Sequence, residues 1–95
     1  MKKTKEPILH LPVKTEYFLE IKSGEKEFEF RLYNKYWQKR LEGKKYRKIK
    51  VTKGYPKNTD YDRIVERPYL GFDVREIVHK HFGSEPVMVF AIRVN

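Results

Sequence analysis

The hydrophobic pattern of the chain changes its period on either side of Gly24, and this change restricts the fold more than any other feature. In Tyr17–Ile21 the apolar side chains are three and four positions apart, as on the buried face of a helix. In Glu27–Leu32 apolar and charged residues alternate, as in a strand. Thr15 is placed to cap the helix, and Gly24 is placed to end it in the left-handed conformation. A mixed α+β domain is therefore expected.

The other segments of the chain follow the same two patterns. We expect strands at Ile8–Val13, Glu27–Leu32, Tyr46–Lys53, within Arg63–Phe72 and at Val87–Val94, and helices at Glu16–Ser23 and Asn34–Glu42. A short strand and a helical turn are expected within Asp73–Phe82. Pro68 is expected to interrupt its strand or to confine it to an edge, whereas the apolar run Val87–Val94 is expected to be central. Residues 1–95 are thus predicted to form one α+β domain, a small mixed β-barrel of about five or six strands with two or three short helices, preceded by a flexible basic arm at 1–7.

The positive charge of the chain is concentrated in one segment, Lys35–Lys57. It contains ten basic residues and one acid, which accounts for the whole formal net charge of +9. Four aromatic residues are interleaved with the cations, and such a mixture favours RNA or single-stranded nucleic acid, because cations neutralise phosphates and aromatic rings stack on bases. A solvated face that keeps the protein soluble is the alternative, and an anionic membrane surface is a weaker third interpretation. The expected nucleic-acid contacts are Lys35, Trp37, Lys39, Arg40, Lys44, Lys45, Arg47, Lys48, Lys50, Lys53, Tyr55 and Lys57.

Several classes of protein are disfavoured by what the sequence lacks. There is no cysteine, which excludes disulfides and zinc–thiolate sites and suits a reducing compartment, so we expect a cytoplasmic protein. No apolar run approaches the roughly 20 residues of a membrane span. A metal site needs at least one more well-placed ligand than His79 and His81, so we expect surface residues there and no metal site, although His81 could act in acid–base work. No cofactor-binding or hydrolase motif is present, and no cofactor is expected.

The densest polar group in the sequence is Lys26, Glu29 and Arg31, just after the helix end at Gly24. Glu29 and Arg31 share one face of the expected strand. A carboxylate between two cations is expected to stay ionised with a depressed pKa. Glu29 could accept hydrogen bonds from a base while the two cations contact phosphate or a developing oxyanion. The alternative is an ordinary ladder of ion pairs worth less than about 1 kcal/mol.

Residues Tyr17 to Arg31 also resemble the signature of the ASCH domain, a branch of the PUA-like superfamily. That signature is an apolar helix, then G-x-K, then an alternating strand ending in E-x-R or T-x-R. Here it is Gly24-Glu25-Lys26 followed by Glu29-Phe30-Arg31. The similarity extends over nearly the whole chain to Tyr36-Trp37, Arg40-Leu41, Gly54–Asn58, Phe82-Gly83 and Val89–Ile92.

The resemblance implies a small β-barrel with a cleft beside the first helix. ASCH-type proteins are implicated in RNA binding, and bacterial examples include a ribonuclease and an amidohydrolase that acts on acetylated cytidine. By motif position, Lys26 and Arg31 match a lysine and an arginine of that amidohydrolase. Glu29 takes the place of its threonine, which is regarded as the nucleophile there, so this chain departs from the family pattern at that position.

The function expected from the sequence is an RNA- or nucleotide-binding module, monomeric and without a membrane partner. The segment Lys35–Lys57 would contact phosphates, and a cleft with Lys26, Glu29 and Arg31 would receive a base or nucleotide. One alternative is a metal-independent hydrolase, either a ribonuclease or a nucleoside amidohydrolase, with the same three residues as catalytic groups. The second alternative is an interaction domain whose basic face binds an acidic protein.

Overall fold

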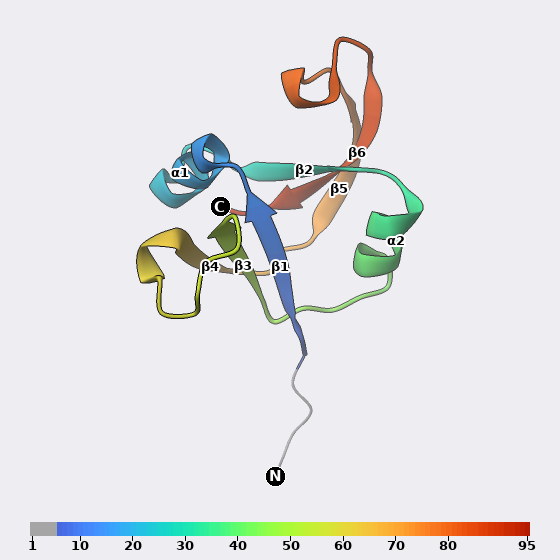
Figure 1. The fold of residues 1–95 in the computed structure, drawn as a ribbon. Helices are drawn as coiled ribbons and strands as arrows, with labels where there is room; N and C mark the ends of the chain where they lie inside the picture. The colour runs from blue at the N-terminus through green and yellow to red at the C-terminus, as the bar shows by residue number, and fades with distance from the viewer. Residues whose placement is uncertain (1–5) are drawn as a thin grey trace.

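The computed structural model describes residues 6–95 of the chain (Figure 1). Residues 1–5, most of the expected basic arm at 1–7, lie outside the described residues. The elements in chain order are β1 (Ile8–Val13), α1 (Thr15–Ser23), β2 (Phe28–Leu32), α2 (Lys35–Leu41), β3 (Lys48–Lys53), the 3-10 turn η1 (Tyr61–Arg63), β4 (Ile64–Pro68), β5 (Phe72–Ile77), the 3-10 turn η2 (Lys80–Phe82) and β6 (Val87–Arg93). The expected α+β class is confirmed.

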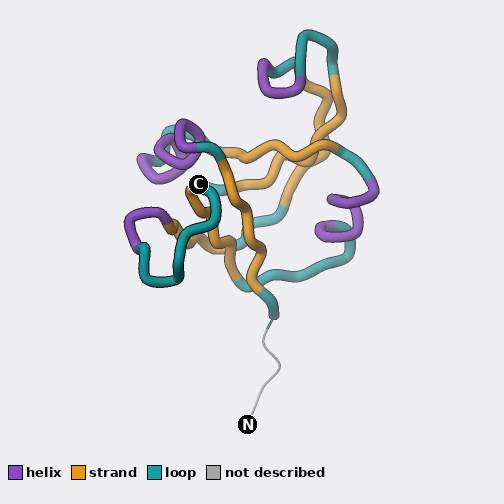
Figure 2. Tube along the Cα trace, viewed as in Figure 1, coloured by secondary structure: helices purple, strands orange, loops and turns teal. Residues whose placement is uncertain are grey.

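The strands form two three-stranded sheets (Figure 2). One sheet has the order β1-β3-β4, with β1 parallel to β3 and β3 antiparallel to β4. The other has the order β2-β6-β5 and is antiparallel throughout. As expected, β6 is central and Pro68 ends an edge strand. No closed barrel is found over residues 6–95, so the barrel stays a prediction.

A shared hydrophobic core is formed by the inner faces of both sheets and by α1. Alternate residues of β1 and β3 point into it, and Phe90 and Ile92 enter it from β6. Burying such a side chain stabilises the fold by about 1.5–3 kcal/mol. The buried cluster is Leu9, Leu11, Val13, Tyr17, Phe18, Ile21, Leu41, Ile49, Val51, Val65, Phe90, Ile92 and Val94. The buried helix face expected at Tyr17, Phe18 and Ile21 is confirmed.

The two ends of α1 differ in how well they were predicted. Gly24 ends the helix at φ +92°, as expected for a left-handed stop. The expected cap by Thr15 is wrong, because Thr15 is already the first helical residue and the cap position falls on the extended Lys14, without a side-chain hydrogen bond. Asn34 caps α2 instead, since its side chain accepts a hydrogen bond from the Trp37 N–H at 3.0 Å.

Strand β2 directs its charged residues toward the interior. In the antiparallel register Glu29 pairs with Ile92 and Arg31 with Phe90, and directly paired residues lie on the same face of the sheet. Glu29 and Arg31 therefore lie on the face of the core residues Ile92 and Phe90. The alternating apolar residues of β2 face the other way and are half-buried or exposed. Strand β2 therefore turns its charged face, and not its apolar face, toward the edge of the core.

Candidate functional site

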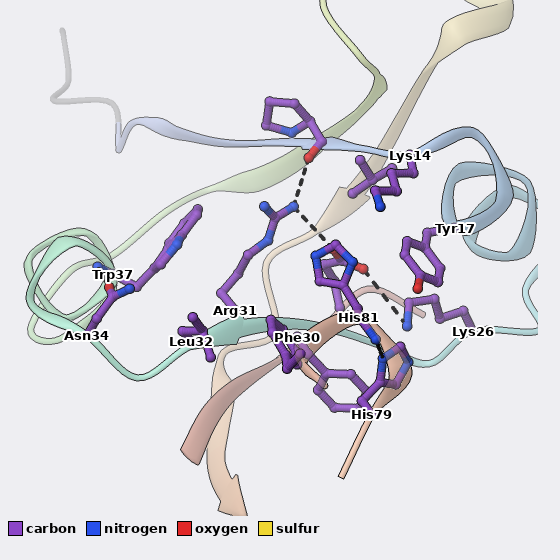
Figure 3. A pocket seen from close by; sticks show the side chains of 14 residues that line it. Lys14, Tyr17, Lys26, Phe30, Arg31, Leu32, Asn34, Trp37, His79 and His81 are labelled. Carbon is purple, nitrogen blue, oxygen red and sulfur yellow. Dashed lines mark hydrogen bonds and ion pairs between the residues drawn. The ribbon is translucent and has the colours of Figure 1, made fainter. Parts of the chain in front are cut away.

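A pocket of about 260 Å³ opens between the end of β1 and strand β2 (Figure 3). It includes residues from both sheets, from α1 and α2, and from the β5–β6 connection that carries η2. Trp37 and Asn34 lie at one end, Tyr17 and Lys26 at the other, and Arg31 between them. The lining residues are Pro12, Val13, Lys14, Tyr17, Lys26, Glu29, Phe30, Arg31, Leu32, Asn34, Trp37, His79, His81 and Phe82.

The three residues predicted as the catalytic group, Lys26, Glu29 and Arg31, meet in this pocket. Arg31 Nη2 lies 3.2 Å from Glu29 Oε2, and Lys26 Nζ lies 3.9 Å from Glu29 Oε1. The Glu29 side chain is only 9% exposed. The carboxylate is therefore flanked by a cation on each side and has little contact with water.

Glu29 does not have the depressed pKa that the sequence suggested. Burial raises its pKa above the usual 4.5, and the attraction of Arg31 and Lys26 offsets this only in part. The expectation was wrong because it considered the attraction of the two cations but not the loss of hydrating water, which disfavours the charged carboxylate. A buried carboxyl whose pKa is raised, in a pocket, is typical of a functional group rather than of a stabilising surface ion pair.

Arg31 connects the two sheets across the pocket. Its Nη2 donates a hydrogen bond of 2.8 Å to the Pro12 carbonyl oxygen of β1. The guanidinium carbon lies 5.1 Å from the centre of the Trp37 ring, within cation–π range. Its Nε is buried without a hydrogen-bond partner among the described residues. Such an orphaned donor is costly unless an acceptor reaches it.

Lys26 is held between two aromatic rings and by two backbone bonds. Its Nζ lies 5.1 Å from the Tyr17 ring centre and 4.9 Å from that of Phe30. Its backbone N–H donates to the Glu20 carbonyl at 3.0 Å, and its own carbonyl accepts from Asn95 Nδ2 at 2.7 Å. The ammonium group is thereby positioned without a direct hydrogen bond to Glu29.

The β5–β6 connection contributes pocket residues that were expected only at the surface. His79 caps the 3-10 turn η2 and His81 lies within it, and this turn brings both side chains to the pocket. His79 Nδ1 accepts the His81 N–H at 3.1 Å, and both rings lie about 6 Å from Tyr17. Burial first, and then the nearby Lys14, His79 and Arg31, lowers the pKa of His81 from 6.5. The imidazole therefore favours its neutral form near pH 7.

Other pocket residues were also missed as site residues. Lys14 adds a third cation, and Phe82, Phe30 and Tyr17 add aromatic surface. Tyr17 had been interpreted as core alone, and its pKa is raised, chiefly by burial. Their positions in the sequence could have indicated this, because Lys14 precedes helix α1, Tyr17 lies in its first turn, and the helix ends beside Lys26.

Of the twelve predicted nucleic-acid contacts, Trp37 alone lines the pocket. Lys35, Lys39 and Arg40 lie on α2, the helix that supplies Trp37, and Tyr55 is 91% exposed in the turn after β3. The rest lie on the α2–β3 loop (Lys44, Lys45, Arg47), on β3 (Lys48, Lys50, Lys53) and in the following turn (Lys57).

Two of the β3 lysines already have polar neighbours. Lys48 Nζ pairs with Glu66 at 2.8 Å, and this hydrogen bond lowers the pKa of Glu66. Lys50 Nζ lies 3.5 Å from Asn58 Oδ1. Part of the segment's charge is thus compensated locally, which sequence counting did not reveal.

No protein-family model matches the chain, and comparison with curated proteins and with solved structures likewise gives no match. Within residues 6–95 no helix is long and apolar enough to cross a membrane. In the same range no three histidine, aspartate or glutamate side chains are grouped so as to hold a metal ion.

Proposed function

We propose that this domain binds RNA or a nucleotide and that the pocket between β1 and β2 receives a base or nucleotide. The observation that carries the proposal is the composition of the pocket wall. Lys26 and Arg31 flank one carboxylate, Lys14 adds a third cation to the wall, and aromatic side chains form much of the remaining described surface. Cations bind phosphate, whereas aromatic faces stack on bases. A nucleotide offers both chemistries in one ligand.

The size of the pocket supports a small ligand. Its volume of about 260 Å³ lies just below the roughly 300–1,000 Å³ of typical small-molecule sites. A single base or nucleoside suits this space better than a longer segment. The neighbouring nucleotides of an RNA strand would then lie outside it, along the cationic α2, whose cap residue Asn34 lines the pocket.

Trp37 offers a direct test, because it is the only tryptophan of the chain and lies in the pocket. We expect mononucleotides and a single-stranded RNA oligomer to change its fluorescence in a saturable way. Arg31→Ala should weaken binding at least about tenfold, since charge-assisted contacts are stronger than neutral ones. Arg63→Ala, on the exposed turn η1, is the matched control. Absence of binding by every nucleotide and RNA would overturn the proposal, and displacement only by acidic proteins would favour an interaction domain.

Hydrolysis is the second candidate, and the buried carboxyl of Glu29 with its raised pKa is the observation that favours it. Glu29 would move a proton, Lys26 would polarise the scissile group and Arg31 would hold the anion. Labelled RNA and acetylcytidine are the two substrates to assay. Because a general acid or base contributes about 10²–10⁴-fold, Lys26→Ala and Glu29→Gln should each lower turnover by at least about 100-fold. Activity that survives both changes would come from a contaminant.

The ASCH resemblance and the barrel form part of this proposal. They are supported by the meeting of the motif residues Lys26, Glu29 and Arg31 at one pocket. If the two sheets are one curled sheet of order β1-β3-β4-β5-β6-β2, then β1 and β2 are its facing edges, with the pocket between them. Nuclear Overhauser contacts between the backbones of β4 and β5 would support this closure. Their absence would leave two separate sheets.

A further inference from the structure

We propose that Glu29 determines the specificity of the pocket by selecting guanine, the base whose pairing edge carries two adjacent N–H donors. This inference rests on the proposed function and deepens it, because it names which nucleotide the site prefers. Glu29 has no role in phosphate binding, because phosphate contacts need only the cations.

The Glu29 carboxylate is an acceptor that the fold leaves available. Only 9% of the Glu29 side chain is exposed, and this side chain lines the pocket. Arg31 Nη2 donates a hydrogen bond to the Pro12 carbonyl and forms an ion pair with Glu29 Oε2 at 3.2 Å, and Lys26 Nζ lies 3.9 Å from Glu29 Oε1. These ion pairs neutralise the charge but leave lone pairs on both oxygens free for a ligand.

The order of groups across this part of the pocket matches the edge of guanine. A carboxylate presents two acceptors side by side, and here a cation stands next to each oxygen. The guanine edge presents N2–H, N1–H and O6, which is two donors followed by an acceptor. The two oxygens of Glu29 would accept from N1–H and N2–H, and Lys26 or Arg31 would donate to O6.

The other bases do not match this order. Adenine and cytosine place one amino group beside a ring nitrogen that is itself an acceptor, and uracil has one N–H between two carbonyls. Against an ionised carboxylate each would bring an acceptor toward an oxygen lone pair. Such mismatched polar contacts in a site shielded from water reduce affinity strongly.

The inference can be tested on the native protein by comparing its affinities for a series of nucleotides. Tryptophan fluorescence or calorimetry would compare GMP with AMP, CMP, UMP and IMP at pH 7.5. We expect GMP to bind about 5- to 150-fold more tightly than AMP, CMP and UMP, because one good bidentate pair corresponds to a factor in this range. IMP, which keeps N1–H and O6 but lacks the amino group, should fall between GMP and UMP.

The variant Glu29→Gln adds a second test, because it should change which base the pocket prefers rather than only weaken binding. A glutamine amide presents one donor and one acceptor, so preference should move from GMP toward AMP or CMP. Glu76→Gln, an exposed acid on β5, should leave the GMP preference unchanged. Equal affinity of the native protein for all five nucleotides would overturn the inference and leave the proposed function intact. Binding of none of them, and of no RNA, would overturn the proposed function itself.

Discussion

Arg31 of β2 donates a 2.8 Å hydrogen bond to the backbone carbonyl of Pro12 in β1, and this bond joins the facing edges of two separate sheets. An edge strand presents backbone groups that need partners, and a guanidinium can satisfy them without bringing the strands together. The two edges remain far enough apart to leave a pocket. Arg31 therefore both bridges the opening and lines it.

The first prediction concerns the stability that this connection supplies. Arg31→Ala should lower the free energy of unfolding by about 1–3 kcal/mol, because the part-buried Pro12 carbonyl and the Glu29 carboxylate both lose their partner. Urea denaturation measures the change as a lower midpoint. Arg75→Ala removes an exposed pair with Asp73 and should cost well under 1 kcal/mol. Equal losses in both variants would mean that Arg31 does not connect the sheets.

Much of the fold was predictable because the signals for it are local. Ile8–Val13 was predicted with its observed bounds, and the glycine stop after α1 follows from backbone sterics alone. The central position of β6 follows from its nearly continuous apolar run, since a strand covered on both faces needs no polar side. Periodicity and turn chemistry are sufficient for features of this kind.

The candidate site was predictable only in part, because pockets depend on long-range placement. Alternation in β2 revealed that the strand has two faces but not that the charged face points inward. The contribution of His79 and His81 depends on the 3-10 turn η2 and its position beside Tyr17, over 60 residues away in the chain. The balance between burial and charge at Glu29 was also unpredictable, since the sequence alone does not show how much water the carboxyl loses on folding.

The second prediction is a pH dependence of stability that originates at Glu29. Burial raises its folded-state pKa above 4.5, so the native state holds this proton more tightly than the unfolded chain does. The resulting stabilisation is complete below about pH 4.5 and is lost as the pH rises through the folded-state pKa. Unfolding free energies of the native protein and of Glu29→Gln, measured from pH 4 to 8, should therefore diverge in favour of the variant.

The size of this divergence is bounded. One pKa unit corresponds to about 1.4 kcal/mol, so the difference can change by at most about 1.4 kcal/mol per pH unit. Glu76→Gln controls for the general effect of removing an acid and should run parallel to the native protein. A native protein that gains stability over Glu29→Gln as the pH rises would show that the cations outweigh burial.

The third prediction concerns Asn95, which acts on the site from outside the pocket. Its Nδ2 donates to the carbonyls of Ile21 and Lys26, and its Oδ1 accepts from Arg67 Nε at 3.0 Å. Asn95→Ala should cost about 1–3 kcal/mol of stability because part-buried partners are left unpaired. Ligand affinity should also fall, since the backbone of Lys26 loses a constraint. Asn58→Ala, at an exposed turn, is the control for the loss of an asparagine side chain that does not hold the site.

The fourth prediction separates the two groups of lysines by the salt dependence of RNA binding. For a single strand, the log–log slope changes by about 0.7 for each phosphate that a cation neutralises. Lys35 and Lys39 are exposed on α2 beside the pocket rim, so replacing both with alanine should reduce the slope by about 1.4.

The β3 pair provides the comparison for this fourth prediction. Lys48 is already paired with Glu66 at 2.8 Å and releases fewer counterions on binding. Replacing Lys48 and Lys50 together should therefore change the slope less than the α2 pair does, and fluorescence titrations between 50 and 200 mM salt would measure both. A larger effect of the β3 pair would place the RNA backbone on the β1-β3-β4 sheet, because only uncompensated cations that touch phosphates contribute to the slope.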